Sequence, residues 1–221
     1  LGTVPVEADG SAYFRAPARK PIYFQAIDAQ GRAVQTMRSV TYLQSGERRG
    51  CVGCHEPLRA APVPARTLAS ARPPSTIEAG PDGTRPFGYP LLVQPVLDRH
   101  CVTCHDGSTG KDKSPLVLTG DAAGAFSRSY ESLKPYLKWY EWGTKSIAAN
   151  VSTPGEVGAD QSRLTRVLAD ATHAPKLDLS EEDRTRLYVW LDGNVPFYGT
   201  YTQAEQQAQR AGRPVPPPQI Q

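Results

Sequence analysis

All four cysteines of this 221-residue chain lie in two copies of one short motif, Cys-x-x-Cys-His. The two copies have the same spacing and consist of Cys51, Cys54 and His55, and of Cys101, Cys104 and His105. Two cysteines three positions apart can reach the two vinyl groups of one porphyrin, and the adjacent histidine can bind its iron from the proximal side. The motifs therefore predict two covalently attached haems c, with His55 and His105 as the proximal iron ligands.

Two other uses of paired cysteines explain this pattern less well. A zinc site would use the four thiolates as ligands, but it would not require a histidine directly after each pair. A redox-active or structural disulfide would also leave both histidines unexplained. Two copies that use every cysteine and half of the four histidines are not expected by chance, so the haem interpretation is favoured.

The distal iron ligands must come from a short inventory, His100, His173 and the single methionine, Met37. His173 follows a predicted helix over residues 164–168. Single-haem cytochromes supply the sixth ligand from a loop between two helices that follow the motif, so His173 is the favoured distal ligand of the second haem. The alternative is an exposed loop histidine.

His100 and Met37 are the candidates for the distal ligand of the first haem. His100 directly precedes Cys101 on one predicted helix, so it cannot reach the distal side of the haem attached there, but it could bind a neighbouring iron. Met37 would raise the reduction potential of the haem that it binds. The alternatives are a surface histidine and a methionine packed in the core.

The fold class predicted is α+β, with a small antiparallel β module at residues 1–45. Alternating side chains at residues 22–27 indicate a strand, and Asp9-Gly10 and Gln30-Gly31 are typical of turns. Three or four strands of this kind are too small to be stable alone and should pack on the next part of the chain. Residues 46–86 hold the first motif and a proline-rich segment, which is predicted to be an extended surface connection.

Residues 87–202 are predicted to form a mainly α, loop-rich cytochrome c-like domain around the second motif. Pro95 is suited to the first turn of the helix that carries this motif. A later helix contains Leu187, Trp190 and Leu191. Ser180 and Asp183 are placed as a capping box at its start, and Gly193 is placed to end it. The glutamine- and proline-rich tail, residues 203–221, is predicted to be poorly ordered.

Charge and hydropathy narrow the partners that a chain like this would have. The formal charge of +3 and a pI near 8.7 give no strong bias toward nucleic acid, so none is predicted as a partner. No run of 18 apolar residues exists, and no transmembrane segment is predicted. Haem c maturation and the cysteine usage point to a periplasmic or extracellular location, as part of a larger secreted redox protein.

Several stretches of the chain resemble the haem-bearing region of the hydrazine synthase alpha-subunit family. The matching segments are MRSVTY at 37–42, GE at 46–47, GCVGCHEP at 50–57, VQPVLDR at 93–99 and WLDGNVPFYG at 190–199. The resemblance implies a strand-rich segment that leads into a dihaem cytochrome domain of a large secreted protein. It also implies that the second iron is held between His105 and His173, which agrees with the choice made from the residues.

The chain departs from that family at the first haem. In the family, a tyrosine four residues after the motif histidine binds iron, while that histidine turns to zinc. Arg59 stands at this position here. Hydrazine chemistry and the zinc ion are therefore not carried over to this chain.

The function predicted from these features is electron transfer by a dihaem c-type cytochrome domain, with redox partner proteins or fused redox domains. The alternative is a haem enzyme, in which an open first haem acts on peroxide or a small nitrogen compound. No catalytic residue is assigned. A third hypothesis, haem as a structural staple, is weaker because two haems are more than a staple needs.

Overall fold

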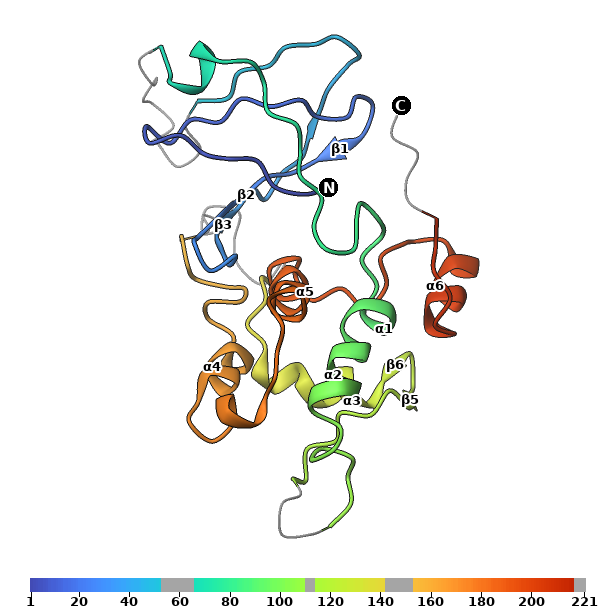
Figure 1. Ribbon diagram of the computed structural model, residues 1–221. Helices are drawn as coiled ribbons and strands as arrows, with labels where there is room; N and C mark the ends of the chain where they lie inside the picture. Colours follow the sequence, from blue (N-terminus) through green and yellow to red (C-terminus); the bar gives the residue numbers. More distant parts are fainter. Residues whose placement is uncertain (53–65, 110–113, 142–152, 217–221) are drawn as a thin grey trace. The chain divides into compact units, whose positions relative to one another are not determined.

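The computed structural model describes residues 1–52, 66–109, 114–141 and 153–216, and it combines short antiparallel strand pairs with helices (Figure 1). This mixture is consistent with the predicted α+β class. The chain divides into two compact units. One contains residues 1–23 and 38–85, and the other contains residues 24–37 and 86–216.

The first unit is built from the N-terminal segment and the proline-rich segment together. Strand β1 (Pro21–Ile22) pairs with β4 (Thr41–Tyr42), and isolated bridges join Thr3 to Glu78 and Phe14 to Ser75. The one-turn helix η1 (Ala69–Ala71) buries Ala69 almost completely. The segment from residue 66 was predicted to be an extended surface connection. Its backbone instead forms bridges with residues 3–14.

The predicted β module is divided between the two units. Strand β2 (Gln25–Ile27) pairs with β3 (Ala33–Thr36) across a turn in which Asp28 accepts a hydrogen bond from Arg32 N, and this hairpin belongs to the second unit. Asp192 holds the hairpin in place, since its Oδ2 accepts from Ala33 N at 2.8 Å. The strands and the Gln30-Gly31 turn are thus present, but they form separate pairs instead of one module.

The rest of the second unit is mainly helical, with one short strand pair. Its elements are α1 (Tyr89–Leu92), α2 (Gln94–His100), β5 (Ala122–Ala123), β6 (Phe126–Ser127), α3 (Arg128–Leu133), η2 (Lys134–Tyr136), α4 (Arg163–Ala169), η4 (Ala174–Lys176), α5 (Glu181–Asp192) and α6 (Gln203–Arg210). Pro95 lies in the first turn of α2, as its missing N–H allows. Ser180 Oγ accepts from Asp183 N at the start of α5, and Gly193 follows the helix, as predicted.

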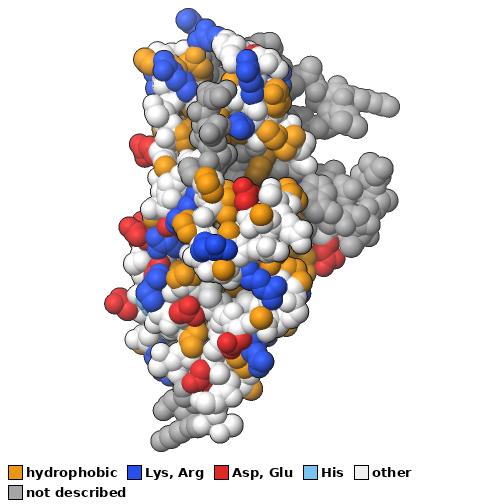
Figure 2. All heavy atoms as spheres, turned by 90° about the vertical axis from the view of Figure 1, so that its right-hand side faces the viewer, with side chains coloured by type: hydrophobic (Ala, Val, Ile, Leu, Met, Phe, Trp, Pro, Cys, Tyr) orange, Lys and Arg blue, Asp and Glu red, His pale blue; other side chains and the backbone are white. Residues whose placement is uncertain are grey.

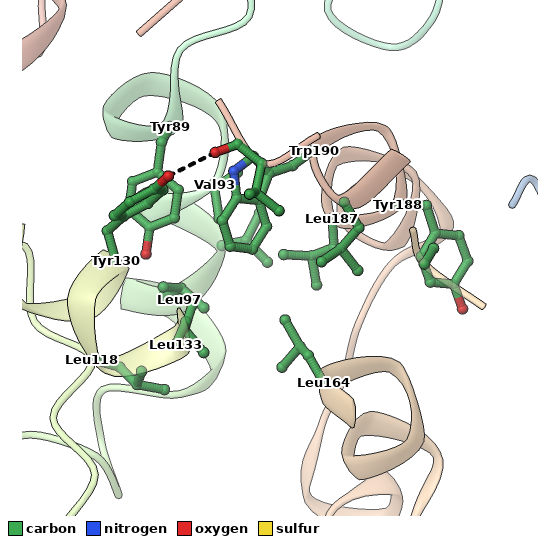
Figure 3. Close-up of a cluster of buried hydrophobic side chains, with 14 of the residues drawn as sticks. Tyr89, Val93, Leu97, Leu118, Tyr130, Leu133, Leu164, Leu187, Tyr188 and Trp190 are labelled. Atoms are coloured by element: carbon green, nitrogen blue, oxygen red, sulfur yellow. Dashed lines mark hydrogen bonds between the residues drawn. The ribbon is translucent and has the colours of Figure 1, made fainter. Parts of the chain in front are cut away.

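The core of this unit forms where α1, α2, α3 and α5 meet, and Figure 3 shows its aromatic and aliphatic side chains directed toward one another. Trp190 and Tyr89 are fully buried, with ring centres 5.1 Å apart. Their polar atoms are satisfied inside the core, because Trp190 Nε1 donates to Pro196 O and Tyr89 Oη donates to Ser129 Oγ. The dashed line in Figure 3 marks the bond from Tyr130 Oη to Val195 O, 2.8 Å long.

The segment predicted as a poorly ordered tail begins with a helix, α6. Gln209 of α6 is fully buried, and its Oε1 accepts from Gly199 N at 3.1 Å. A Cβ atom on Gly88 would lie 2.9 Å from the Gln209 side chain, so the close packing depends on that glycine. Residues 203–210 are therefore part of the fold, because Gly88, far away in the sequence, makes room for the Gln209 side chain.

Candidate haem-binding site

The second motif continues α2 by one more turn. Cys104 N donates to Cys101 O at 3.1 Å, and His105 N donates to the same oxygen at 3.0 Å. Cys101 is partly buried and Cys104 is exposed, and both are free thiols. Burial, with a smaller contribution from Cys104, raises the pKa of the Cys101 thiol to about 11. One turn thus holds the two thiols and the histidine together, as attachment of a single porphyrin requires.

A returning loop fixes the ring of His105. Leu118 N donates to His105 O at 2.8 Å, and the Nδ1 atom of His105 lies 3.3 Å from Leu116 O. Burial lowers the pKa of His105, against a smaller opposing effect of the Leu116 bond. The ring is therefore neutral near pH 7, with Nδ1–H donating to the carbonyl and Nε2 left as the metal-binding nitrogen.

His173 faces His105 from the loop between α4 and α5. The centres of the two imidazole rings are 6.4 Å apart, and the ring planes are within 13° of parallel. Imidazole–metal bonds of about 2 Å and ring radii of about 1 Å place two imidazoles on opposite sides of one iron with centres about 6 Å apart. The observed separation thus fits a haem iron between the two histidines.

Apolar side chains lie next to this pair. Val102 and Leu116 beside the motif, and Leu177 and Leu179 before α5, are partly buried and pack against the core of the second unit. All four are close in the sequence to one of the two histidines, and a porphyrin face would cover apolar side chains of this kind. The donor set and its surroundings therefore fit a haem c held by Cys101, Cys104, His105 and His173.

An ionic cluster ties the end of α2 to the start of α5. Asp183 Oδ1 accepts from Arg99 Nη2 and from Arg186 Nη1, each at 2.6 Å, and its Oδ2 lies 3.0 Å from His100 Nε2. Although burial opposes it, the hydrogen bonds from His100, Arg186 and Arg99 lower the pKa of Asp183. The Asp183 carboxylate was expected to complete a capping box, but the side chains of Arg99, Arg186 and His100 bind it instead.

The structure bears differently on the two candidates for the first distal ligand. His100 has one ring nitrogen engaged by Asp183, which is the partner that a buried structural histidine would have. Met37 directly follows β3, and its N donates to Phe24 O at 2.9 Å. Cys51 of the first motif is exposed, whereas Cys54, His55 and Arg59 lie outside the described residues. The ligands of the first haem therefore stay a prediction.

Several residues of the site were not anticipated from the sequence. Asp183 binds the last two residues of α2, directly before the second motif. Thr172 Oγ1 lies 3.1 Å from Nδ1 of the His173 ring. The Asp-x-Thr spacing at residues 170–172 is a local signal for such a contact. The partners of Asp183 on α2 lie more than 80 positions away, so no local pattern announces them.

Two features are not found in the described part of the chain. No three His, Cys, Asp or Glu side chains there form a group able to hold a metal ion by themselves. Within the same residues, none of the helices has the length and apolar character needed to cross a bilayer.

On the face in Figure 2, basic and acidic side chains are interspersed, which agrees with the weak overall charge.

Comparisons with known proteins point to one family. The model of the hydrazine synthase alpha subunit middle domain matches residues 1–56, a range that includes the first motif. Hydrazine synthase subunit alpha of Kuenenia stuttgartiensis is 25% identical over 187 residues, which cover 60% of this chain and 23% of that protein. No solved structure matches the chain. The two matches support a relation between this chain and the hydrazine synthase alpha subunit. The matched region is less than a quarter of that relative's length.

Proposed function

We propose that this chain is a dihaem c-type cytochrome module that transfers electrons within a larger exported redox protein. The observation that carries the proposal is the opposed pair of imidazoles, His105 and His173, 6.4 Å apart beside two free thiols. The relation to the hydrazine synthase alpha subunit supports a redox-related haem protein. Redox proteins or fused redox domains would be the partners, in the periplasm or outside the cell.

Each residue of the second site has a role in this proposal. Cys101 and Cys104 would form thioether bonds to the two vinyl groups, which fixes the position of the porphyrin. His105 and His173 would both hold the haem iron through Nε2, which would leave no iron site for a small molecule. A bound haem would supply one-electron Fe(III)/Fe(II) chemistry. Two histidines that hold the iron in both oxidation states would suit electron transfer.

A second candidate function is catalysis at the first haem. The family match at residues 1–56 covers the first motif, and the relative that matches is named as a subunit of an enzyme. In this case the first iron would lack a strong sixth ligand and would bind peroxide or a small nitrogen compound. Arg59 stands where the resembling family has an iron-binding tyrosine, so hydrazine synthesis itself is not proposed.

Spin state separates the two functions. For electron transfer we expect purified full-length chain, produced in a host that matures cytochromes c, to give only low-spin ferric signals. These signals should be unchanged by cyanide or nitric oxide and should titrate reversibly. A high-spin ferric signal that shifts on adding cyanide would contradict the electron-transfer assignment for that haem and would support catalysis.

A further inference from the structure

The loop that carries His173 contains a short chain of hydrogen bonds that ends at its ring. Thr172 Oγ1 lies 3.1 Å from His173 Nδ1, and the same hydroxyl lies 2.6 Å from Asp170 Oδ1. Thr172 N also donates to Asp170 Oδ1, at 2.8 Å. Asp170 directly follows α4, so the carboxylate, the hydroxyl and the imidazole are held in sequence by one tight turn.

Counting protons fixes the direction of each bond. Asp170 Oδ1 is an acceptor, because the backbone N–H of Thr172 can only donate and points to this oxygen at 2.8 Å. A hydroxyl has one hydrogen, and at 2.6 Å that hydrogen is donated to Asp170. The remaining lone pairs of Thr172 Oγ1 must therefore accept from His173 Nδ1–H. This leaves the lone pair of His173 on Nε2, directed away from the chain of bonds.

We infer that Thr172 is a positioning residue which, backed by Asp170, holds His173 in the tautomer that binds iron and makes its Nε2 a stronger donor. The inference rests on the proposed function, because it concerns the distal ligand of the second haem. Partners of this kind on the second ring nitrogen orient metal-bound histidines and raise their basicity. His105 has the uncharged Leu116 carbonyl in the equivalent place, at 3.3 Å, so the charged partner acts on the His173 side.

A stronger donor stabilises ferric iron over ferrous iron, so loss of the Thr172 hydroxyl should raise the reduction potential of the second haem. In a spectroelectrochemical titration of the full holoprotein, we expect Thr172→Val to raise the ferrous-to-ferric ratio at a fixed potential at least threefold. This equals about 28 mV at 59 mV per tenfold change for one electron. Thr172→Ser, which keeps the hydroxyl, should restore the potential of the unmodified protein.

The chain offers a matched control beside the other ligand. Ser108 Oγ donates to Asp106 Oδ1 at 2.7 Å, and Ser108 N donates to the same atom at 2.9 Å. This is the same type of turn, and it begins one residue after His105. Ser108→Ala should therefore leave the potential unchanged. Asp170→Asn keeps the turn but removes the charge, so it should shift the potential in the same direction as Thr172→Val, by less.

The outcomes distinguish this inference from the proposed function. If Thr172→Val leaves the potential unchanged, or if Thr172→Ser shifts it as much as Thr172→Val, the inference is wrong. A low-spin second haem that becomes high spin in His173→Ala would then leave the proposed function intact. If the unmodified protein has no low-spin haem that depends on His173, the proposed function and the inference both fail.

Discussion

Replacement of His173 by alanine is expected to convert the second haem from low spin to high spin while both haems stay attached. The imidazole of His173 faces that of His105 at 6.4 Å, and a strong-field ligand on each side is what keeps ferric haem low spin. Attachment depends on Cys101 and Cys104, which this change does not touch. Electron paramagnetic resonance and visible spectra of the ferric protein would show the conversion.

A matched histidine gives the control for this experiment. His100 lies directly before the same motif, but its Nε2 is 3.0 Å from Asp183 Oδ2, so His100→Ala should leave the second haem low spin. It would change the first haem only if His100 is the distal ligand there. Unchanged low-spin spectra of both haems in His173→Ala would show that the second distal ligand is another residue.

The second large effect is expected on the stability of the second unit, from a change in its core. Trp190 is fully buried, and its ring centre lies 5.1 Å from that of Tyr89 and 6.2 Å from that of Tyr130. Trp190→Ala removes these contacts and leaves a cavity, so the free energy of unfolding should fall by about 3 to 5 kcal/mol. Urea unfolding followed by circular dichroism would measure this loss.

The neighbouring residue on α5 provides the comparison. Val189 is 48% exposed, and Val189→Ala should change the free energy of unfolding by no more than about 0.5 kcal/mol. If Trp190→Ala and Val189→Ala both unfold at the same urea concentration as the unmodified protein, the contacts of Trp190 with Tyr89 and Tyr130 do not stabilise the second unit.

Local features of the sequence predicted those structural elements whose position depends on residues adjacent in the chain. The start of α5 at Ser180 and the place of Pro95 in α2 follow from rules about single helix ends, and the structure confirms both. His173 was chosen from a short inventory, and its ring centre lies 6.4 Å from that of His105. Its role as an iron ligand stays a prediction.

The parts that were wrong depend on contacts between distant segments. Alternation identified strands near residues 22–27, but it does not say which strand pairs with which, so two separate pairs were taken as one module. Asp183 was placed correctly at the third position of α5, yet Arg99 and His100 bind its carboxylate. The tail helix was missed because Gln209 is buried in a space that the distant Gly88 leaves open.

The central claim is that this chain carries two covalently bound haems, and the mass of the denatured protein tests it most directly. Thioether bonds survive unfolding, whereas haem held only by axial ligands is released. For protein from a host that matures cytochromes c, we predict the mass of the polypeptide with two haems, and with one haem after Cys101→Ala and Cys104→Ala are combined. A denatured mass equal to the polypeptide alone would contradict the account.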